Sequence, residues 1–187
     1  CISETVDEVI VEKYFSNGST LKQWTVLNEK GKIDVPLEND NDDNLMISKD
    51  YHLAVAFQDD LSDQVNHLYS FFLTEVPFHL PVLVHGTFDL EGNRNKISNT
   101  KSNAKLLGKL SRLLIKTAEY IAESDELASW KPLNMVYFDE SKYDDRLNAF
   151  KFYAYHLKQI ANSNLFPCHD GKYRYIKDTQ LVNYGRD

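Results

Sequence analysis

A short turn near the middle of the chain carries the side chain with the clearest capacity for chemistry. Residues 80–90 read as a strand that leads into Glu91-Gly92-Asn93-Arg94-Asn95-Lys96-Ile97. A Gly-Asn pair lets the backbone turn sharply, so Arg94 is expected to stand on this turn at the mouth of a sheet. Its guanidinium has a permanent charge and a planar fork of donors that suits phosphate oxygens. The alternative is an ordinary exposed arginine, because arginines are common on protein surfaces.

Other residues of chemically active types lack the spacing that their chemistry needs. Cys168 and His169 are neighbours, and neighbouring side chains on a strand point in different directions. His79 and His85 have no further ligands at metal-binding spacing, whereas zinc takes about four converging ligands. The acidic run at residues 38–44 lacks the Gly and the distal Glu of a calcium loop and is interpreted as a solvated connection. No Gly-x-Ser-x-Gly or phosphate-cradling Gly-rich motif is present, so the chain encodes no self-contained active site.

The composition is that of a folded domain with an excess of negative charge. The 187 residues include 21 Lys+Arg and 28 Asp+Glu, which gives a formal charge of −7. This balance disfavours a general nucleic-acid binder, because such proteins neutralise phosphates with clustered cations. The longest apolar run, residues 53–57, is far shorter than the roughly 20 residues of a membrane span. Two cysteines, Cys1 and Cys168, fit a reducing compartment, so we expect a cytoplasmic protein without a membrane partner.

The first half of the chain has the residue pattern of β structure. Turns are expected at residues 16–19 and 29–32, and Pro77 and Pro81 exclude a helix between the last two strands. The expected strands cover residues 8–15, 21–26, 51–57, 67–73 and 82–90. Because the chain begins at Cys1 without the features of a signal peptide, we interpret it as a piece of a longer protein.

In the second half the hydrophobic period changes to that of helices. Apolar residues at three- and four-residue steps predict a helix over residues 103–122 and a second one whose stripe runs from Leu147 to Ala161. Ser141 and Asp144 resemble a weak capping box for the second helix. Three residues are candidate caps for the first helix: Asn99, Thr100 and Ser102. A closing hairpin is expected over residues 166–182, with its turn at Asp170-Gly171.

Strands first and helices later, without regular alternation, predict an α+β fold. We expect a mixed or antiparallel sheet backed by two long helices. Residues 1–124 would hold the sheet, the Arg94 loop and the first helix. Residues 125–187 would extend the same unit with a helix and the hairpin.

Several segments resemble a known family. Residues 71–73, 80–90 and Asn93-Arg94 resemble the sacsin-like branch of the GHKL ATPases, the superfamily that includes the 90-kDa heat-shock chaperone. In that branch a Leu-Pro-Val-His-type strand runs into a Ser-Asn-Arg loop after the nucleotide-binding domain. The chaperone has a comparable loop followed by a long helix, and residues 99–122 occupy the position of that helix here. Residues 166–173 resemble, more loosely, a Gly-Lys-Tyr hairpin of sacsin-like proteins.

The resemblance covers about residues 66–122 and has clear limits. Gly92 stands where the family usually has Ser, and Asn95 stands where the chaperone has Glu. The chain also lacks the Glu…Asn box, the Asp-x-Gly motif and the Gly-rich lid of the nucleotide-binding domain. The ATP pocket itself is therefore expected outside this chain.

The resemblance implies a transducer segment with a ribosomal-protein-type α+β fold, inactive alone. Arg94 would contact the γ-phosphate of ATP held by a preceding nucleotide-binding domain, with Asn93 and Lys96 as further binding residues. ATP and Mg²⁺ would belong to that domain, and this chain would carry no cofactor of its own. Such a cation supplied across a boundary contributes roughly 10³–10⁵ in rate. The partners would be that upstream domain and a possible protein client.

Two alternatives remain open from the residues alone. The first is a non-enzymatic interaction domain, in which an exposed sheet and the aromatic second helix dock a partner protein. Four aromatic residues carry that idea: Phe150, Phe152, Tyr153 and Tyr155. Phe152 and Tyr155 lie off the main stripe of the helix and are expected to form an exposed apolar patch. The second alternative is a hydrolase centred on Cys168 and His169.

Overall fold

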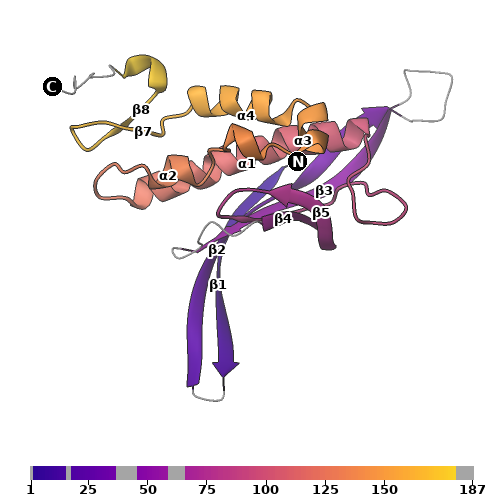
Figure 1. Cartoon of the computed structure of the whole chain (residues 1–187), viewed down its shortest axis with the longest axis horizontal. Coiled ribbons are helices and arrows are strands. Elements are labelled where there is room, and N and C mark those ends of the chain that lie inside the picture. The colour runs from indigo at the N-terminus through magenta and orange to yellow at the C-terminus, as the bar shows by residue number, and fades with distance from the viewer. Residues whose placement is uncertain (1, 16–17, 37–45, 59–65, 180–187) are drawn as a thin grey trace.

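The computed structural model describes residues 2–15, 18–36, 46–58 and 66–179, and these form a mixed six-stranded sheet with helices on one face (Figure 1). The strands are β1 (Ser3–Phe15), β2 (Gly18–Pro36), β3 (Met46–Phe57), β4 (Asn66–Ser70), β5 (Phe72–Phe78) and β6 (Leu83–Gly86). Their order is β1-β2-β3-β6-β4-β5, and every neighbouring pair is antiparallel except β4 and β6. The predicted α+β class is confirmed.

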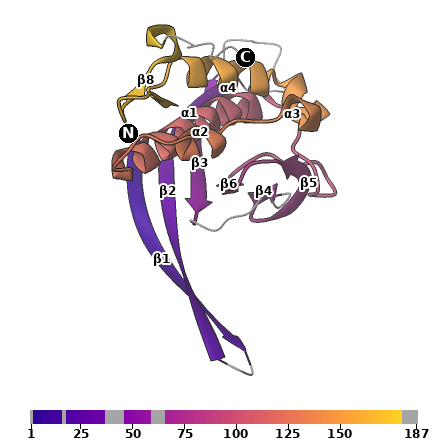
Figure 2. The same ribbon diagram turned by 60° about the vertical axis from the view of Figure 1, so that its left-hand side comes forward.

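β1 and β2 form the longest strand pair of the described residues. Their far ends extend beyond the rest of the sheet as a two-stranded arm, while the helices lie over the sheet as a separate layer (Figure 2). The turn expected at residues 29–32 is wrong, because β2 continues through them and pairs with β3. Gly31 faces the ring of Tyr51, and a Cβ at this position would lie 3.0 Å from Tyr51 Oη. The glycine therefore permits a close approach instead of a turn.

The segment expected as one strand over residues 67–73 is divided in two. Phe71 has a φ of 60°, and β4 and β5 form a hairpin around it. β5 is an edge strand, so it tolerates Pro77, which lacks a backbone N–H. The last expected strand is shorter than residues 82–90, because β6 ends at Gly86. Beyond it, Leu90 forms an isolated bridge with Ile97.

The long helix α1 (Lys101–Ser124) confirms the first helical prediction, with Thr100 as its cap. Thr100 Oγ1 accepts a hydrogen bond from Asn103 N at 3.1 Å. The helix buries one face against the sheet, where alternate side chains of β3, such as Leu53 and Val55, are fully buried. Its buried leucines are Leu106, Leu107, Leu110, Leu113 and Leu114.

The second expected helix is broken, so the described chain has one long helix rather than two. The pieces after α1 are α2 (Lys131–Asn134), a 3-10 turn (Glu140–Lys142), α3 (Asp145–Ala149) and α4 (Phe152–Ala161). Lys151 separates α3 from α4 with a φ of 56°, a left-handed conformation. Asp144 caps α3 through its own carboxylate, which accepts from Arg146 N and Leu147 N. Ser141 instead donates to Asp139, so the expected capping box is wrong.

The closing hairpin is present between β7 (Phe166–Pro167) and β8 (Tyr173–Arg174), followed by a 3-10 turn (Ile176–Asp178). Gly171 turns the chain with a φ of 74°, as predicted. The acidic run at 38–44, part of the turn at 16–19 and the end of the hairpin beyond residue 179 lie outside the described residues. No helix in the described part of the chain is long and apolar enough to cross a membrane.

Candidate functional site

The loop between β6 and α1 is closed by backbone hydrogen bonds into a small, defined hairpin. Leu90 and Ile97 pair at its base. Above them Glu91 N donates to Lys96 O at 2.8 Å, and Arg94 N donates to Glu91 O at 2.7 Å. This ladder fixes the path of the chain on both sides of Arg94. The loop therefore has a defined backbone conformation that these hydrogen bonds hold in place.

Arg94 occupies the tip of this hairpin in a left-handed conformation, with a φ of 60°. Asn93 Oδ1 accepts a hydrogen bond from Asn95 N at 3.1 Å, which bridges the tip from one side of Arg94 to the other. A left-handed backbone costs a residue with a side chain about 1–2 kcal/mol. Non-glycine residues that are held this way concentrate at functional sites.

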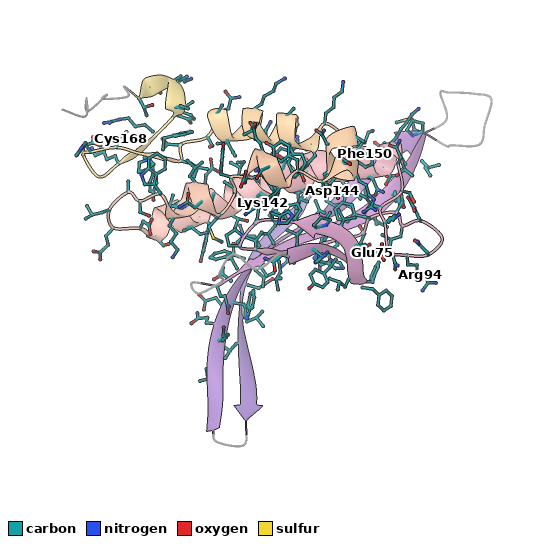
Figure 3. The ribbon with its side chains drawn as sticks, viewed as in Figure 1. Glu75, Arg94, Lys142, Asp144, Phe150 and Cys168 are labelled. Atoms are coloured by element: carbon teal, nitrogen blue, oxygen red, sulfur yellow. The ribbon has the colours of Figure 1, made fainter. Side chains whose placement is uncertain are left out.

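The tip of the loop is also tied to the edge strand β5. Asn95 Nδ2 donates to Glu75 Oε1 at 2.9 Å, and Glu75 N donates to Asn95 O at 2.7 Å. Figure 3 shows Glu75 beside the Arg94 loop. The loop therefore keeps a fixed position relative to the sheet.

The base of the loop is clamped to the first turn of α1 through Asn103, whose side chain is fully buried. Asn103 Nδ2 donates to Asp89 O at 2.8 Å and to Ser98 O at 2.7 Å. Asn103 Oδ1 accepts from Asp89 N at 2.9 Å. The Asp89 carboxylate accepts from Thr100 Oγ1 at 3.1 Å and pairs with Lys49. Sheet, loop and helix thus meet in one polar network.

The Arg94 side chain itself is exposed and projects away from the body of the molecule (Figure 3). Within the described part of the chain its guanidinium makes no hydrogen bond or ion pair. All of its donors are therefore available to an anion from outside. Asn93 is exposed on the same loop, and Lys96 is half-buried beside it. The structure thus brings the three sequence-predicted residues together on one loop.

The other sequence candidates lie elsewhere. Cys168 is half-buried in the closing hairpin, at the opposite end of the molecule from Arg94 (Figure 3), and its Sγ donates to Phe166 O at 3.8 Å. Within the ranges that the structure describes, no three His, Cys, Asp or Glu side chains gather in a group that could hold a metal ion. His85 Nε2 instead accepts a hydrogen bond from Phe71 N at 3.3 Å, and burial lowers the pKa of this imidazole.

The expected aromatic patch on the second helix is wrong for Phe152. Phe152 and Tyr153 are each only 2% exposed and pack around Phe138 in the core. The break at Lys151 rotates α4 relative to α3, so the stripe counted from Leu147 does not continue. Tyr155 and Phe150 are half-buried.

Sequence reasoning missed the residues that position Arg94. Glu75 and Asn103 have polar side chains of common types, and nothing local marks them. The contact of Glu75 depends on the β4–β5 hairpin, which the sequence pattern did not reveal.

Comparisons with protein-family models, curated proteins and solved structures find no match to this chain.

Proposed function

We propose that this chain is the transducer segment of a GHKL-type ATPase of the sacsin-like kind, and that Arg94 contacts the γ-phosphate of ATP held by a preceding domain. The observation that carries the proposal is an unpartnered arginine on a loop that is fixed on every side. The family resemblance of residues 66–122 supplies the identity of the partner and of the nucleotide. Cytoplasmic location remains part of the same proposal.

The loop is suited to this role because it presents a charge without needing to rearrange. Donors that are already in place stabilise charge that develops in a transition state more effectively than mobile ones. Arg94 would donate from its guanidinium to oxygens of the transferred phosphoryl group. Mg²⁺ in the preceding domain would neutralise further phosphate charge, and no residue of this chain is assigned to it. Asn93 would act by holding the tip of the loop, and Lys96 would add positive charge.

The same contact gives this chain a way to sense the nucleotide. Arg94 meets a γ-phosphate only while that phosphate is present, so hydrolysis would remove the contact. Because Asn103 joins the loop to α1, the helix would follow any change in the position of the loop.

The test is steady-state ATPase activity and ATP affinity of the protein in which this chain follows its nucleotide-binding domain. Arg94→Ala should reduce turnover by roughly 10³-fold while ATP affinity changes little, because the lost contact matters mainly in the transition state. Arg94→Lys should retain part of the activity. Lys101→Ala is the matched control, since Lys101 is an exposed cation at the start of α1. Wild-type turnover in Arg94→Ala would refute the proposal.

A second candidate is a protein-interaction domain, and one observation favours it. Phe71, Phe72 and Leu73 are 75%, 63% and 57% exposed at the turn into the edge strand. Beside them is a shallow apolar groove of about 290 Å³ on the sheet face away from the helices. For this function, Phe72→Asp should abolish the binding of a partner that co-purifies with the wild-type protein, and Arg94→Ala should leave that binding intact.

A further inference from the structure

A hollow of the molecule lies away from the Arg94 loop, between β2, α1 and the start of α4. Its volume is about 580 Å³. This is within the range of about 300–1,000 Å³ that is usual for small-molecule sites. Thirteen described residues line it: Ile33, Ala104, Lys105, Leu107, Gly108, Lys109, Arg112, Phe150, Lys151, Phe152, Ala154, Tyr155 and Lys158. None of them belongs to the loop at residues 90–97.

Positive charge is concentrated in this cavity, although the chain as a whole carries a net charge of −7. Five of the lining residues are cations, and none of the lining residues is acidic: Lys105, Lys109, Arg112, Lys151 and Lys158. Three of them follow one another along one face of α1, one (Lys151) directly precedes α4, and one (Lys158) lies in the last turn of α4. Two helices therefore contribute cations to the same space.

Two of these cations already have partners inside the protein. Lys109 Nζ donates to Tyr51 Oη at 2.8 Å and to Glu29 Oε1 at 3.1 Å. Burial lowers the pKa of Lys109, but these hydrogen bonds outweigh it and leave the pKa raised, so the amine stays charged. Lys105 donates to the carbonyl oxygen of Asp34.

The remaining three cations face the cavity without a counterion. Within the described residues, Arg112, Lys151 and Lys158 make no ion pair. All three side chains are exposed. Like charges brought together repel one another, so an anion that enters the cavity would relieve this repulsion. The unpaired charge therefore favours a ligand with more than one negative charge.

Lys151 is held at the mouth of the cavity by an unusual backbone. Its φ of 56° breaks the helix, and α4 begins at the next residue without a side-chain cap. The first turn of α4 therefore adds the positive end of a helix dipole to the wall that Lys151 and Phe152 form, which favours phosphate.

The rest of the lining is apolar and includes flat rings. Phe150 and Tyr155 are both half-buried at the cavity surface, and Leu107 and Ala154 complete this side. Aromatic side chains stack on planar groups, and arginine also stacks on them. A ligand that joins anionic groups to a planar ring would use both parts of the lining.

Gly108 opens the floor of the cavity. It lies in the middle of α1, where glycine is among the least favourable helix residues. A Cβ at this position would meet nothing within 4 Å. Packing therefore does not require the glycine, and its effect is to leave space between Lys105 and Arg112.

We propose that this cavity binds a small molecule that carries a diphosphate and a planar ring. Arg112, Lys151 and Lys158 bind the phosphates, and Phe150 and Tyr155 contact the ring. The site is independent of the proposed role of Arg94, because no residue is shared between them.

The test is isothermal titration calorimetry of the 187-residue chain with ADP, pyrophosphate and adenosine as probes. ADP should bind with one-to-one stoichiometry, and both pyrophosphate and adenosine should bind more weakly, because each fills half of the site. Added salt should weaken the binding of ADP, because it screens the unpaired cations. Equal affinities for ADP and pyrophosphate would overturn the role of the ring.

Variants locate the site. Arg112→Ala and Lys158→Ala should each reduce ADP affinity by about tenfold or more, since each removes a charged hydrogen-bond donor. Lys177→Ala, on an exposed cation of the closing segment, is the matched control and should leave the affinity unchanged. If the charge variants have no effect, or the folded wild-type chain binds neither ADP nor pyrophosphate, the cavity is not a binding site.

Gly108 gives a test that does not depend on removing charge. Gly108→Leu should abolish ADP binding by filling the floor, while the midpoint of thermal unfolding does not fall. Gly108→Ala should retain binding, because a single methyl group leaves the cavity open. Retained binding in Gly108→Leu would overturn the proposal. Loss of ADP binding in Arg94→Ala would also overturn it by placing the anion on the loop, and this result would leave the proposed ATPase role standing.

Discussion

Asn95 and Glu75 hold each other through two hydrogen bonds that run in opposite directions. The Asn95 side chain donates to the Glu75 carboxylate at 2.9 Å, and the Glu75 backbone N–H donates to the Asn95 carbonyl at 2.7 Å. The residues are 20 positions apart, one on the loop and the other on the edge strand. The position of Arg94 therefore depends on a strand that is remote in sequence.

Loss of this tie should loosen the loop without unfolding the protein. Glu75→Ala removes the side-chain bond and keeps the backbone bond. We expect faster amide hydrogen exchange at Asn95, by about tenfold, if the lost bond contributes about 1.4 kcal/mol to local stability. Under the proposed ATPase role, the turnover of this chain joined to a nucleotide-binding domain should fall less than in Arg94→Ala. Glu91→Ala is the control, because only the backbone of Glu91 supports the loop. Unchanged exchange in Glu75→Ala would contradict this role.

The left-handed conformation of Arg94 predicts a separation of stability from activity. Glycine adopts a φ of 60° without the steric penalty of a Cβ. Arg94→Gly should therefore raise the free energy of unfolding by about 1 kcal/mol, whereas Arg94→Ala should not raise it. Under the proposed ATPase role, both variants should lose ATP turnover when the chain is joined to a nucleotide-binding domain. Urea denaturation of the two variants side by side measures the difference, and equal stabilities would show that the backbone there is unstrained.

Asn103 should be far more important for stability than its exposed neighbour Asn99. Asn103→Ala removes all side-chain partners of Asp89 N, Asp89 O and Ser98 O at a buried position. Leaving such groups without partners destabilises a protein by about 1–3 kcal/mol for each group. We expect a total loss of about 3 kcal/mol in chemical denaturation. Asn99→Ala should change the stability by less than about 0.5 kcal/mol, and similar effects in the two variants would contradict the clamp.

The sequence pattern predicts the helices and strands whose residue types follow a regular local pattern. Leucines at helical steps located α1, and Thr100 was among the candidate caps. The strands β1 and β3 were found from their β-branched and aromatic residues, although both are longer than predicted. These features are local, so a short window of residues contains most of the information.

The breaks at Phe71, between β4 and β5, and at Lys151, between α3 and α4, were not predictable from local sequence patterns. Phe71 and Lys151 adopt left-handed conformations that neither residue type favours, so only packing from distant segments explains them. The residues around Gly31 alone predict a turn. The close approach of Gly31 to Tyr51 becomes apparent only when the pairing of β2 with β3 is known. For the site, the Gly-Asn pair located Arg94, but the tie to Glu75 depends on the unpredicted break at Phe71 that begins β5. The tie of Asn103 to Asp89 and Ser98 depends on how the loop folds back on the first turn of α1.

The stability of the helical layer should fall with acid because of His156. This side chain is 1% exposed; its Nε2–H donates to Val136 O at 2.7 Å, and its Nδ1 accepts from Ser111 Oγ at 2.9 Å. Burial lowers the pKa of His156 from 6.5 to about 4, despite the hydrogen bond to Val136. The unfolded chain therefore takes up a proton before the folded one does.

The free energy of unfolding should consequently decrease as the pH falls from 6.5 toward about 4, by up to about 3 kcal/mol. Urea denaturation at a series of pH values measures this slope. His156→Gln should flatten it, whereas His79→Gln should leave it in place. An equally steep slope in His156→Gln would assign the acid sensitivity to other groups.

The clamp at Asn103 has a mechanical consequence for the whole chain. It attaches the Arg94 loop to the N-terminal end of α1, whose 24 residues extend for about 36 Å. At the C-terminal end of α1, Asp125 accepts a hydrogen bond from the Tyr173 hydroxyl of the closing hairpin at 2.8 Å. A tilt of α1 imposed at the loop would therefore also move that hairpin. Under the proposed transducer role, a change at Arg94 would then reach the closing hairpin at the opposite end of the molecule (Figure 3).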